Sequence, residues 1–145
     1  MVIMKKILLI TLAATFSASA LAGDSTFSKF DPAWAEVEKK AIQALGQPVQ
    51  RQLVDMAYAE IATDVCPGIV LDKTAITRGF DQMAANSGKT TAIEKQGFDR
   101  NMMAFFGIYT GLLLAESFVD KETFCAGVDG VKQKKSGPTQ FWTAK

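Results

Sequence analysis

The stretch NMMAFFGIYTGLLLA, residues 101–115, decides the fold of this chain. It contains no charged side chain, and almost every residue in it is apolar or small. A helix that is apolar on all sides is typical of the interior of a protein or of a membrane. We therefore predict that this stretch is the central helix of a small all-α domain, around which the other helices pack.

A membrane span is the alternative interpretation of this stretch. A helix that crosses a bilayer needs about 20 mainly apolar residues. The uncharged run is shorter, contains Asn101 and Thr110, and is bounded by Arg100 and Glu116. These features favour a buried core helix, and we expect no membrane span in the mature chain.

The same stretch contains two glycines, Gly107 and Gly111. Glycines four residues apart lie on one face of a helix and allow another backbone to approach closely. The spacing predicts close packing of a neighbouring helix against this face. A slot for a small ligand or a dimer face is the alternative.

Apolar residues at helical spacing, together with residues typical of helix starts, predict a bundle of four to five helices. The predicted starts are Asp31-Pro32, Gln47-Pro48, Asp72, Thr90 or Thr91, and Asp120. We expect Asp31 to cap the first helix, and Gly97 to bend or break the chain before the central run. Apolar residues seldom alternate over four or more positions, so no strand is predicted.

The N-terminus has the pattern of a secretory signal peptide. Two lysines precede an apolar segment, residues 7–20, and the Ala-Leu-Ala at 20–22 places small residues at the positions that a signal peptidase recognises. We expect residues 1–22 to be cleaved and the protein to be periplasmic. Residues 23–145 then form a single helical domain with a C-terminal aromatic tail.

The charge of the mature chain gives no sign of a nucleic-acid partner. The 16 basic residues less the two lysines of the signal peptide leave 14, against 15 acidic residues, so the net charge is about −1. Binding to nucleic acid or to an anionic membrane surface depends on excess positive charge. We expect neither partner.

Cys66 and Cys125 are the two cysteines of the chain, and both lie in the part expected to be exported. Two thiols of a small domain in an oxidising compartment most often pair. We therefore predict a Cys66–Cys125 disulfide. A metal site is not predicted, because the chain has no His and no Cys-x-x-Cys pair.

The residue types that most catalytic sites require are missing. No His is present to act as general base, and no Gly-x-Ser-x-Gly motif occurs. Glu60 and Asp64 lie four residues apart and can do acid–base work only if one of them is desolvated; we expect both to face water. The sequence predicts no catalytic, cofactor-binding or metal-binding residue, no cofactor, and no enzyme.

The tail contains two aromatic residues, Phe141 and Trp142, after the break at residues 136–138. Such residues either dock on the surface of their own domain or are exposed as a hook for a partner. We expect docking and keep Phe141 and Trp142 as candidate partner-binding residues.

Three short segments carry a resemblance: Ile-Ala-Thr-Asp-Val-Cys at 61–66, Phe-Cys-Ala-Gly at 124–127, and the ending with Ser-Gly at 136–137 and Phe-Trp at 141–142. They resemble a group of small exported proteobacterial proteins of unknown function that have a signal peptide, helices and one Cys pair. The architecture is also similar to that of periplasmic immunity proteins that block cell-wall-degrading toxins. Neither resemblance implies a catalytic residue.

Three functions are consistent with these observations. The first is a periplasmic protein-binding module of the inhibitor, immunity or secretion-accessory type, with an unidentified protein partner. The second is a carrier or sensor of a small apolar ligand bound beside Gly107 and Gly111, and the third is a small carboxylate-based hydrolase. A carrier requires a cavity of at least ~300 Å³, a binding module an exposed apolar patch, and a hydrolase convergent acids with shifted pKa values.

Overall fold

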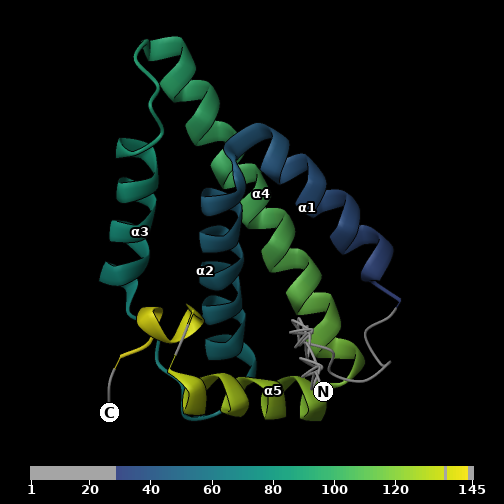
Figure 1. Ribbon diagram of the computed structural model, residues 1–145. Helices are drawn as coiled ribbons and strands as arrows, with labels where there is room; N and C mark the ends of the chain where they lie inside the picture. Colours follow the sequence, from purple (N-terminus) through teal and green to yellow (C-terminus); the bar gives the residue numbers. More distant parts are fainter. Residues whose placement is uncertain (1–28, 136, 144–145) are drawn as a thin grey trace, which may run out of the picture.

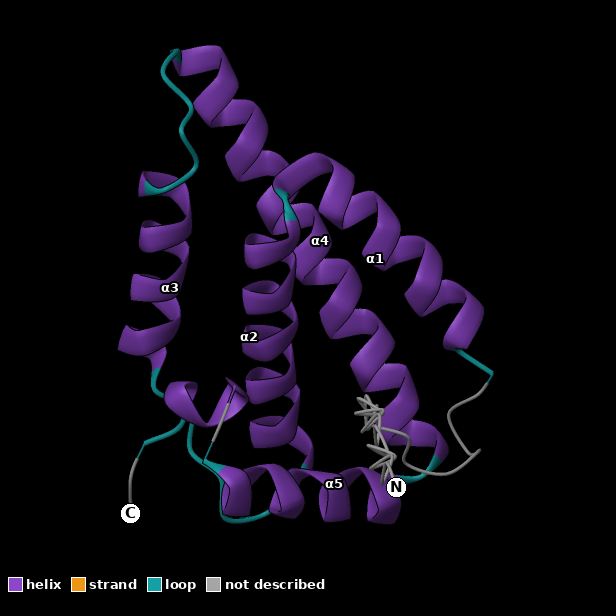
Figure 2. Ribbon diagram, viewed as in Figure 1, coloured by secondary structure: helices purple, strands orange, loops and turns teal. Residues whose placement is uncertain are grey.

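The computed structural model describes residues 29–135 and 137–143, and the predicted signal peptide, residues 1–22, lies outside them. The described chain is mostly helical and contains no strand, apart from an isolated β-bridge between Leu71 and Trp142 (Figure 2). Its elements are α1 (Asp31–Leu45), α2 (Gln47–Val65), α3 (Lys73–Ala85), α4 (Ala92–Val119), α5 (Lys121–Lys134) and the short 3-10 helix η1 (Gly137–Phe141). The all-α prediction with four to five helices is confirmed.

Local capping chemistry sets most of the helix starts. The side chain of Asp72 accepts a hydrogen bond from the Ala75 N–H at the start of α3, and Asp120 accepts one from the Thr123 N–H at the start of α5. Thr91 forms a reciprocal capping box with Glu94 at the start of α4. These side chains satisfy backbone N–H groups that have no partner inside the helix.

Two details of the predicted helix boundaries are wrong. Phe30 occupies the cap position of α1, and Asp31 lies in the first turn, where its charge still favours the helix dipole. The chain does not break at Gly97, because α4 runs through it without interruption. A Cβ atom added at Gly97 would meet no atom within 4 Å, so no close packing requires a glycine there.

Helices α2 and α4 together form the centre of the bundle. α2 contacts α1, α3, α4, α5 and η1, and α4 contacts α1, α2, α3 and α5. In Figure 1, α1 and α3 lie on opposite sides of α2, α4 runs diagonally across the bundle, and α5 lies across its base. The prediction of a central apolar helix within an all-α bundle therefore holds, with α2 as a second central helix.

The prediction that this helix is buried on all sides is wrong. One row of α4 is buried, and its members are Phe98, Met102, Tyr109, Leu113 and Ser117. Other apolar side chains of α4 are exposed: Met103 by 54%, Ile108 by 44% and Phe118 by 79%. The bundle covers one side of α4 only, so apolar residues of α4 that lie outside the buried row remain at the surface.

The length and composition of α4 alone would allow it to cross a membrane. Its most apolar 18-residue window has a mean hydropathy of 1.6, and 28% of that window is buried inside the bundle. Core helices of soluble proteins can also have this length and composition, although most of such a helix is buried. The buried row and the four packed neighbours are the features that place α4 in a helical domain.

The first helix is fixed to α4 by an aromatic contact. Trp34 stacks on Tyr109 with a distance of 5.6 Å between ring centroids, and its indole N–H donates a hydrogen bond to the Glu116 carboxylate. The Tyr109 hydroxyl is buried and makes no hydrogen bond with any described residue. The hydrophobic area of the ring, rather than its hydroxyl, therefore holds this contact together.

The predicted disulfide is confirmed. Cys66 at the C-terminal end of α2 is bonded to Cys125 in α5, and their Cα atoms are 5.5 Å apart. The bond joins residues 59 positions apart in the sequence. It holds α5 across the base of the bundle against the end of α2.

Candidate binding surfaces

One side of α4 exposes several apolar side chains, and we call it the α4 face. Its residues are all exposed: Met103, Ala104, Gly107, Ile108, Gly111 and Phe118. They recur at helical spacing over about 22 Å of helix length at 1.5 Å per residue. None of them is charged, so these residues expose apolar surface to solvent on one side of the helix.

The two glycines lie in the middle of this face and have no neighbour. A Cβ atom added at Gly107 or at Gly111 would meet no atom within 4 Å. The prediction that a neighbouring helix packs closely on them is therefore wrong for the described chain. At 100° per residue, Met103 and Ile108 lie on either side of the glycine row, so the backbone between these two larger side chains is not covered by a side chain of its own.

The C-terminal tail is docked on the bundle. Phe141 is buried, with 3% of its surface exposed, and its carbonyl accepts a hydrogen bond of 2.8 Å from the Asp72 N–H. The Trp142 indole donates to the Ala59 carbonyl over 3.0 Å, and the Thr143 N–H donates to the Val70 carbonyl over 2.9 Å. The tail is thus part of the fold, as expected.

A glycine allows the tail to reach α2. Gly137 has a φ of +58°, and a Cβ atom there would lie 3.0 Å from Oδ1 of Asp55. Both the left-handed backbone and the close approach disfavour a larger residue at this position. Burial against this segment and the rest of the bundle raises the pKa of the Asp55 carboxyl.

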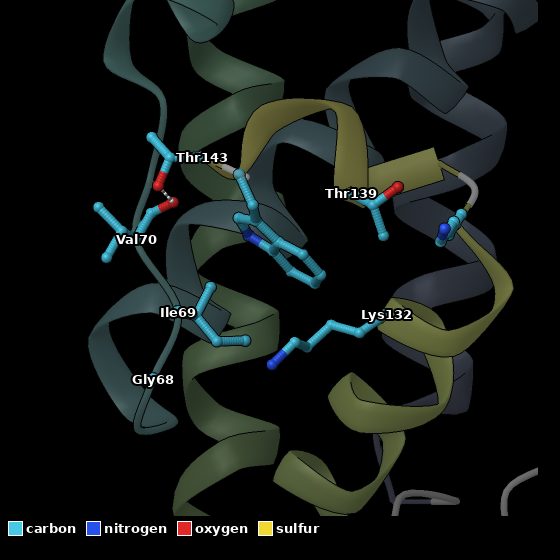
Figure 3. Close-up of a pocket in the computed structure, with 8 residues that line it drawn as sticks. Gly68, Ile69, Val70, Lys132, Thr139 and Thr143 are labelled. Atoms are coloured by element: carbon cyan, nitrogen blue, oxygen red, sulfur yellow. Dashed lines mark hydrogen bonds between the residues drawn. The ribbon is translucent and has the colours of Figure 1, made fainter. Parts of the chain in front are cut away.

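The docked tail forms one wall of a cavity of about 390 Å³, which we call the tail pocket (Figure 3). Its lining residues come from three parts of the chain: Gly68, Ile69, Val70, Lys132, Lys135, Thr139, Trp142 and Thr143. In Figure 3, the side chain of Lys132 extends from α5 towards Ile69. This pocket combines an aromatic and aliphatic wall with two ammonium groups.

The two candidate hook residues have different positions. The side chain of Phe141 belongs to the core, so the exposed-hook interpretation is wrong for this residue. Trp142 is only partly buried and lines the tail pocket. Trp142 therefore remains a candidate contact for a ligand or partner, whereas Phe141 has a structural role.

The carboxyl groups with raised pKa values do not converge on a pocket. Burial raises the pKa of Glu60, and the nearby charge of Asp64 raises it further. Glu60, Asp64, Asp55 and Glu116 line none of the pockets described for this chain. Residues 29–135 and 137–143 also contain no group of three or more potential metal ligands. No observation in this part of the chain favours the hydrolase.

Glu116 provides a pH-dependent contribution to stability. Burial raises the pKa of its carboxyl, the hydrogen bond from Trp34 lowers it, and the charge of Asp31 raises it further, so that the net shift is upward. The folded protein therefore binds more protons than the unfolded chain between the two pKa values. The contribution of Glu116 to the free energy of unfolding is fully present below the pKa that its carboxyl has in the unfolded chain. It is lost as the pH rises through the higher pKa of the folded protein.

We expect Glu116→Gln to raise the melting temperature at pH 7, because the amide removes a partly buried charge and its oxygen still accepts from the Trp34 indole. The gain should disappear at pH 4, where the native carboxyl is also neutral. Thermal melts from pH 4 to pH 8 measure both effects. Glu38→Gln, on the exposed side of α1, is the control and should show no comparable pH-dependent gain. A melting temperature that falls at pH 7 would contradict this account.

Comparison with known proteins gives no further guide to these surfaces. No protein-family model matches the chain, and no similar curated protein or similar solved structure is found.

Proposed function

We propose that this chain is a periplasmic protein-binding module, of the inhibitor, immunity or secretion-accessory type, that binds its partner through the α4 face. The observation that carries the proposal is the exposure of Met103, Ile108 and Phe118 on a strip without charge. Contiguous exposed apolar surface of this kind marks interaction sites in soluble proteins. The signal-peptide pattern and the disulfide support export to an oxidising compartment.

The shape of the α4 face favours a helical partner segment. Gly107 and Gly111 lower the surface along the middle of the face, and Met103 and Ile108 border it. An amphipathic helix that lies along the two glycines can bring its own backbone close to them. Its apolar side chains then pack against Met103 and Ile108. Phe118 at the far end offers a large aromatic anchor, a residue type that often dominates binding energy.

No observation favours the carrier at its predicted place. A carrier that holds an apolar ligand beside Gly107 and Gly111 needs an enclosed cavity there. Both positions instead face open space. The glycines are more consistent with a surface that another protein covers.

The decisive test is the double variant Gly107→Ala/Gly111→Ala. Because both glycines face open space, alanine should stabilise α4 by about 0.5–1 kcal/mol at each position. The added methyl groups should nevertheless block the close approach of a partner backbone and weaken binding about tenfold or more. The partner is first identified by photo-crosslinking in the native periplasm from position Ile108, with Thr77 on α3 as the control position. Affinity is then measured with the purified pair.

Gly130→Ala is the matched control, because Gly130 also has open space around it but lies on α5, away from the α4 face. It should stabilise the fold without changing partner affinity. If the double glycine variant binds the partner as tightly as the native protein, the partner backbone does not approach Gly107 and Gly111 closely, which would contradict the proposal. If position Thr77 captures the same protein as efficiently as position Ile108, the α4 face is not the binding surface.

A further inference from the structure

We propose that the tail pocket binds a small organic carboxylate with a flat apolar body, such as an aromatic acid. This site is separate from the α4 face and does not depend on the proposed function. Its volume of about 390 Å³ lies within the range of small-molecule pockets, and its walls supply both an apolar surface and positive charge.

Among the described residues, no carboxylate compensates the positive charge of the pocket. Lys132 and Lys135 line it, and no acidic residue does. In the described part of the chain, the one ion pair within 4 Å joins Lys40 to Glu36. Lys132 and Lys135 therefore have no carboxylate within 4 Å among the described residues. Two lysines that line one cavity favour an anionic ligand.

The rest of the pocket wall is largely apolar. Ile69 supplies aliphatic surface, whereas the side chain of Val70 points away from Trp142 in Figure 3. The hydrogen bond from the indole N–H of Trp142 to the Ala59 carbonyl fixes the orientation of the ring. The N–H is therefore already used, and the indole offers the pocket its apolar ring surface. An inorganic anion would leave this wall unused, whereas an aromatic carboxylate covers it.

The backbone at Lys135 supplies a further argument. Lys135 ends α5 with a φ of 50°, and it is the one non-glycine residue with a positive φ in residues 29–135 and 137–143. Helices that end in this conformation usually have Gly at that position, because a Cβ atom is unfavourable there. A strained conformation retained at the rim of a pocket points to a role for the side chain that carries it.

Lysines at a helix C-terminus also have a structural explanation, because cations there are favoured by the helix dipole. Lys134 provides the comparison that separates the two explanations. It lies in the same last turn as Lys132 and is exposed, but it does not line the pocket. If the dipole were the only cause, substitutions at Lys134 and at Lys135 would have the same consequences.

The experiment is a titration of the mature chain, residues 23–145, with 4-phenylbutyrate, followed by NMR of the two tryptophan indole N–H groups. We expect saturable binding that shifts the signal of Trp142 and leaves that of Trp34, which is bonded to Glu116, unchanged. The neutral analogue 4-phenylbutan-1-ol and inorganic phosphate should each bind at least tenfold more weakly. N-acetylphenylalanine, which resembles the carboxyl end of a peptide, and its uncharged amide form a second pair. Comparison of the two pairs distinguishes a free acid from a peptide carboxyl end as the source of the ligand. Tighter binding of the acid than of its neutral analogue in either pair supports the proposal.

Variants assign the binding to the pocket. Lys132→Gln and Lys135→Gln should each weaken the binding of 4-phenylbutyrate about two- to fivefold, the range expected for loss of one solvent-exposed ion pair. Lys134→Gln should leave the affinity unchanged. Lys135→Gly should weaken binding while the melting temperature rises or stays constant, which excludes unfolding as the cause.

Three results would overturn the proposal. The first is the absence of saturable binding at the Trp142 signal with either acid. The second is equal binding of 4-phenylbutyrate and its neutral analogue, which would remove the role of the charges. The third is equal weakening by the substitutions at Lys134 and Lys135, which would show a general charge effect.

Discussion

Loss of the Cys66–Cys125 disulfide is expected to lower the free energy of unfolding by about 4 kcal/mol. The bond closes a loop between residues 59 positions apart, and in the chain-entropy model a loop of this length restricts the unfolded chain by about that amount. For a domain of this size the corresponding fall in melting temperature is roughly 15 °C. This is a large share of a typical total stability of about 5–15 kcal/mol.

The effect should be largest at the base of the bundle. α5 contains Gly127 and Gly130, which weaken its intrinsic helix propensity, and the disulfide holds it to the better-packed α2. After reduction, α5 should therefore lose protection from hydrogen exchange before α2 does. The tail pocket, which takes Lys132 and Lys135 from α5, should lose its affinity for 4-phenylbutyrate together with this protection.

Calorimetry of the oxidised and the fully reduced protein measures the loss of stability. The double variant Cys66→Ser/Cys125→Ser should melt close to the reduced native protein, and a reducing agent should not change its melting temperature further. Identical melting of the oxidised and reduced native protein would show that the disulfide does not stabilise the fold.

The elements that the sequence predicted correctly are those specified by a few neighbouring residues. The caps at Asp72, Thr91 and Asp120 each act on backbone groups three residues away, so a short segment contains the whole signal. The cysteine pairing was predictable for a different reason, because a chain with two cysteines has one possible intramolecular pair.

The extent of burial of α4 was not predictable in the same way. The run at 101–115 contains no charge. An uncharged sequence does not distinguish residues buried in the core from residues that form an exposed binding surface. Only the three-dimensional placement of α1, α2, α3 and α5 shows that Met103, Ile108 and Phe118 are left uncovered. Gly107 and Gly111 were recognised as a close-approach surface, but the bundle supplies no helix to occupy it.

The tail pocket had almost no signal in the sequence. It arises because residues 68–70 meet the tail through hydrogen bonds between segments about 70 residues apart, such as that from Thr143 to Val70. In the sequence, Lys132 and Lys135 indicate only a basic helix end. Neither composition nor periodicity predicts the left-handed backbone at Lys135. The aromatic residues of the tail were the one available indication, and of these Trp142 reaches the pocket.

Phe141→Ala is expected to lower the free energy of unfolding by about 3–5 kcal/mol, the usual cost of removing a fully buried aromatic side chain. The ring is 97% buried on the basis of its 3% exposure, and η1 contacts α2, α3 and α5. Its loss leaves a cavity at the point where these helices meet. The hydrogen bond from the Asp72 N–H to the Phe141 carbonyl does not depend on the side chain, so the cost comes from packing.

The neighbouring Gln140→Ala is the matched control, because Gln140 belongs to the same short helix but is exposed. It should change the stability by no more than about 0.5 kcal/mol. Urea unfolding of both variants, with the oxidised disulfide in place, gives the comparison. Because η1 contacts α5, which the disulfide restrains, the two effects share a neighbour, and Phe141→Ala should cost less in the reduced protein than in the oxidised one. Equal stability of the Phe141→Ala and Gln140→Ala variants would contradict the docked tail and return both aromatic residues to the role of an exposed hook.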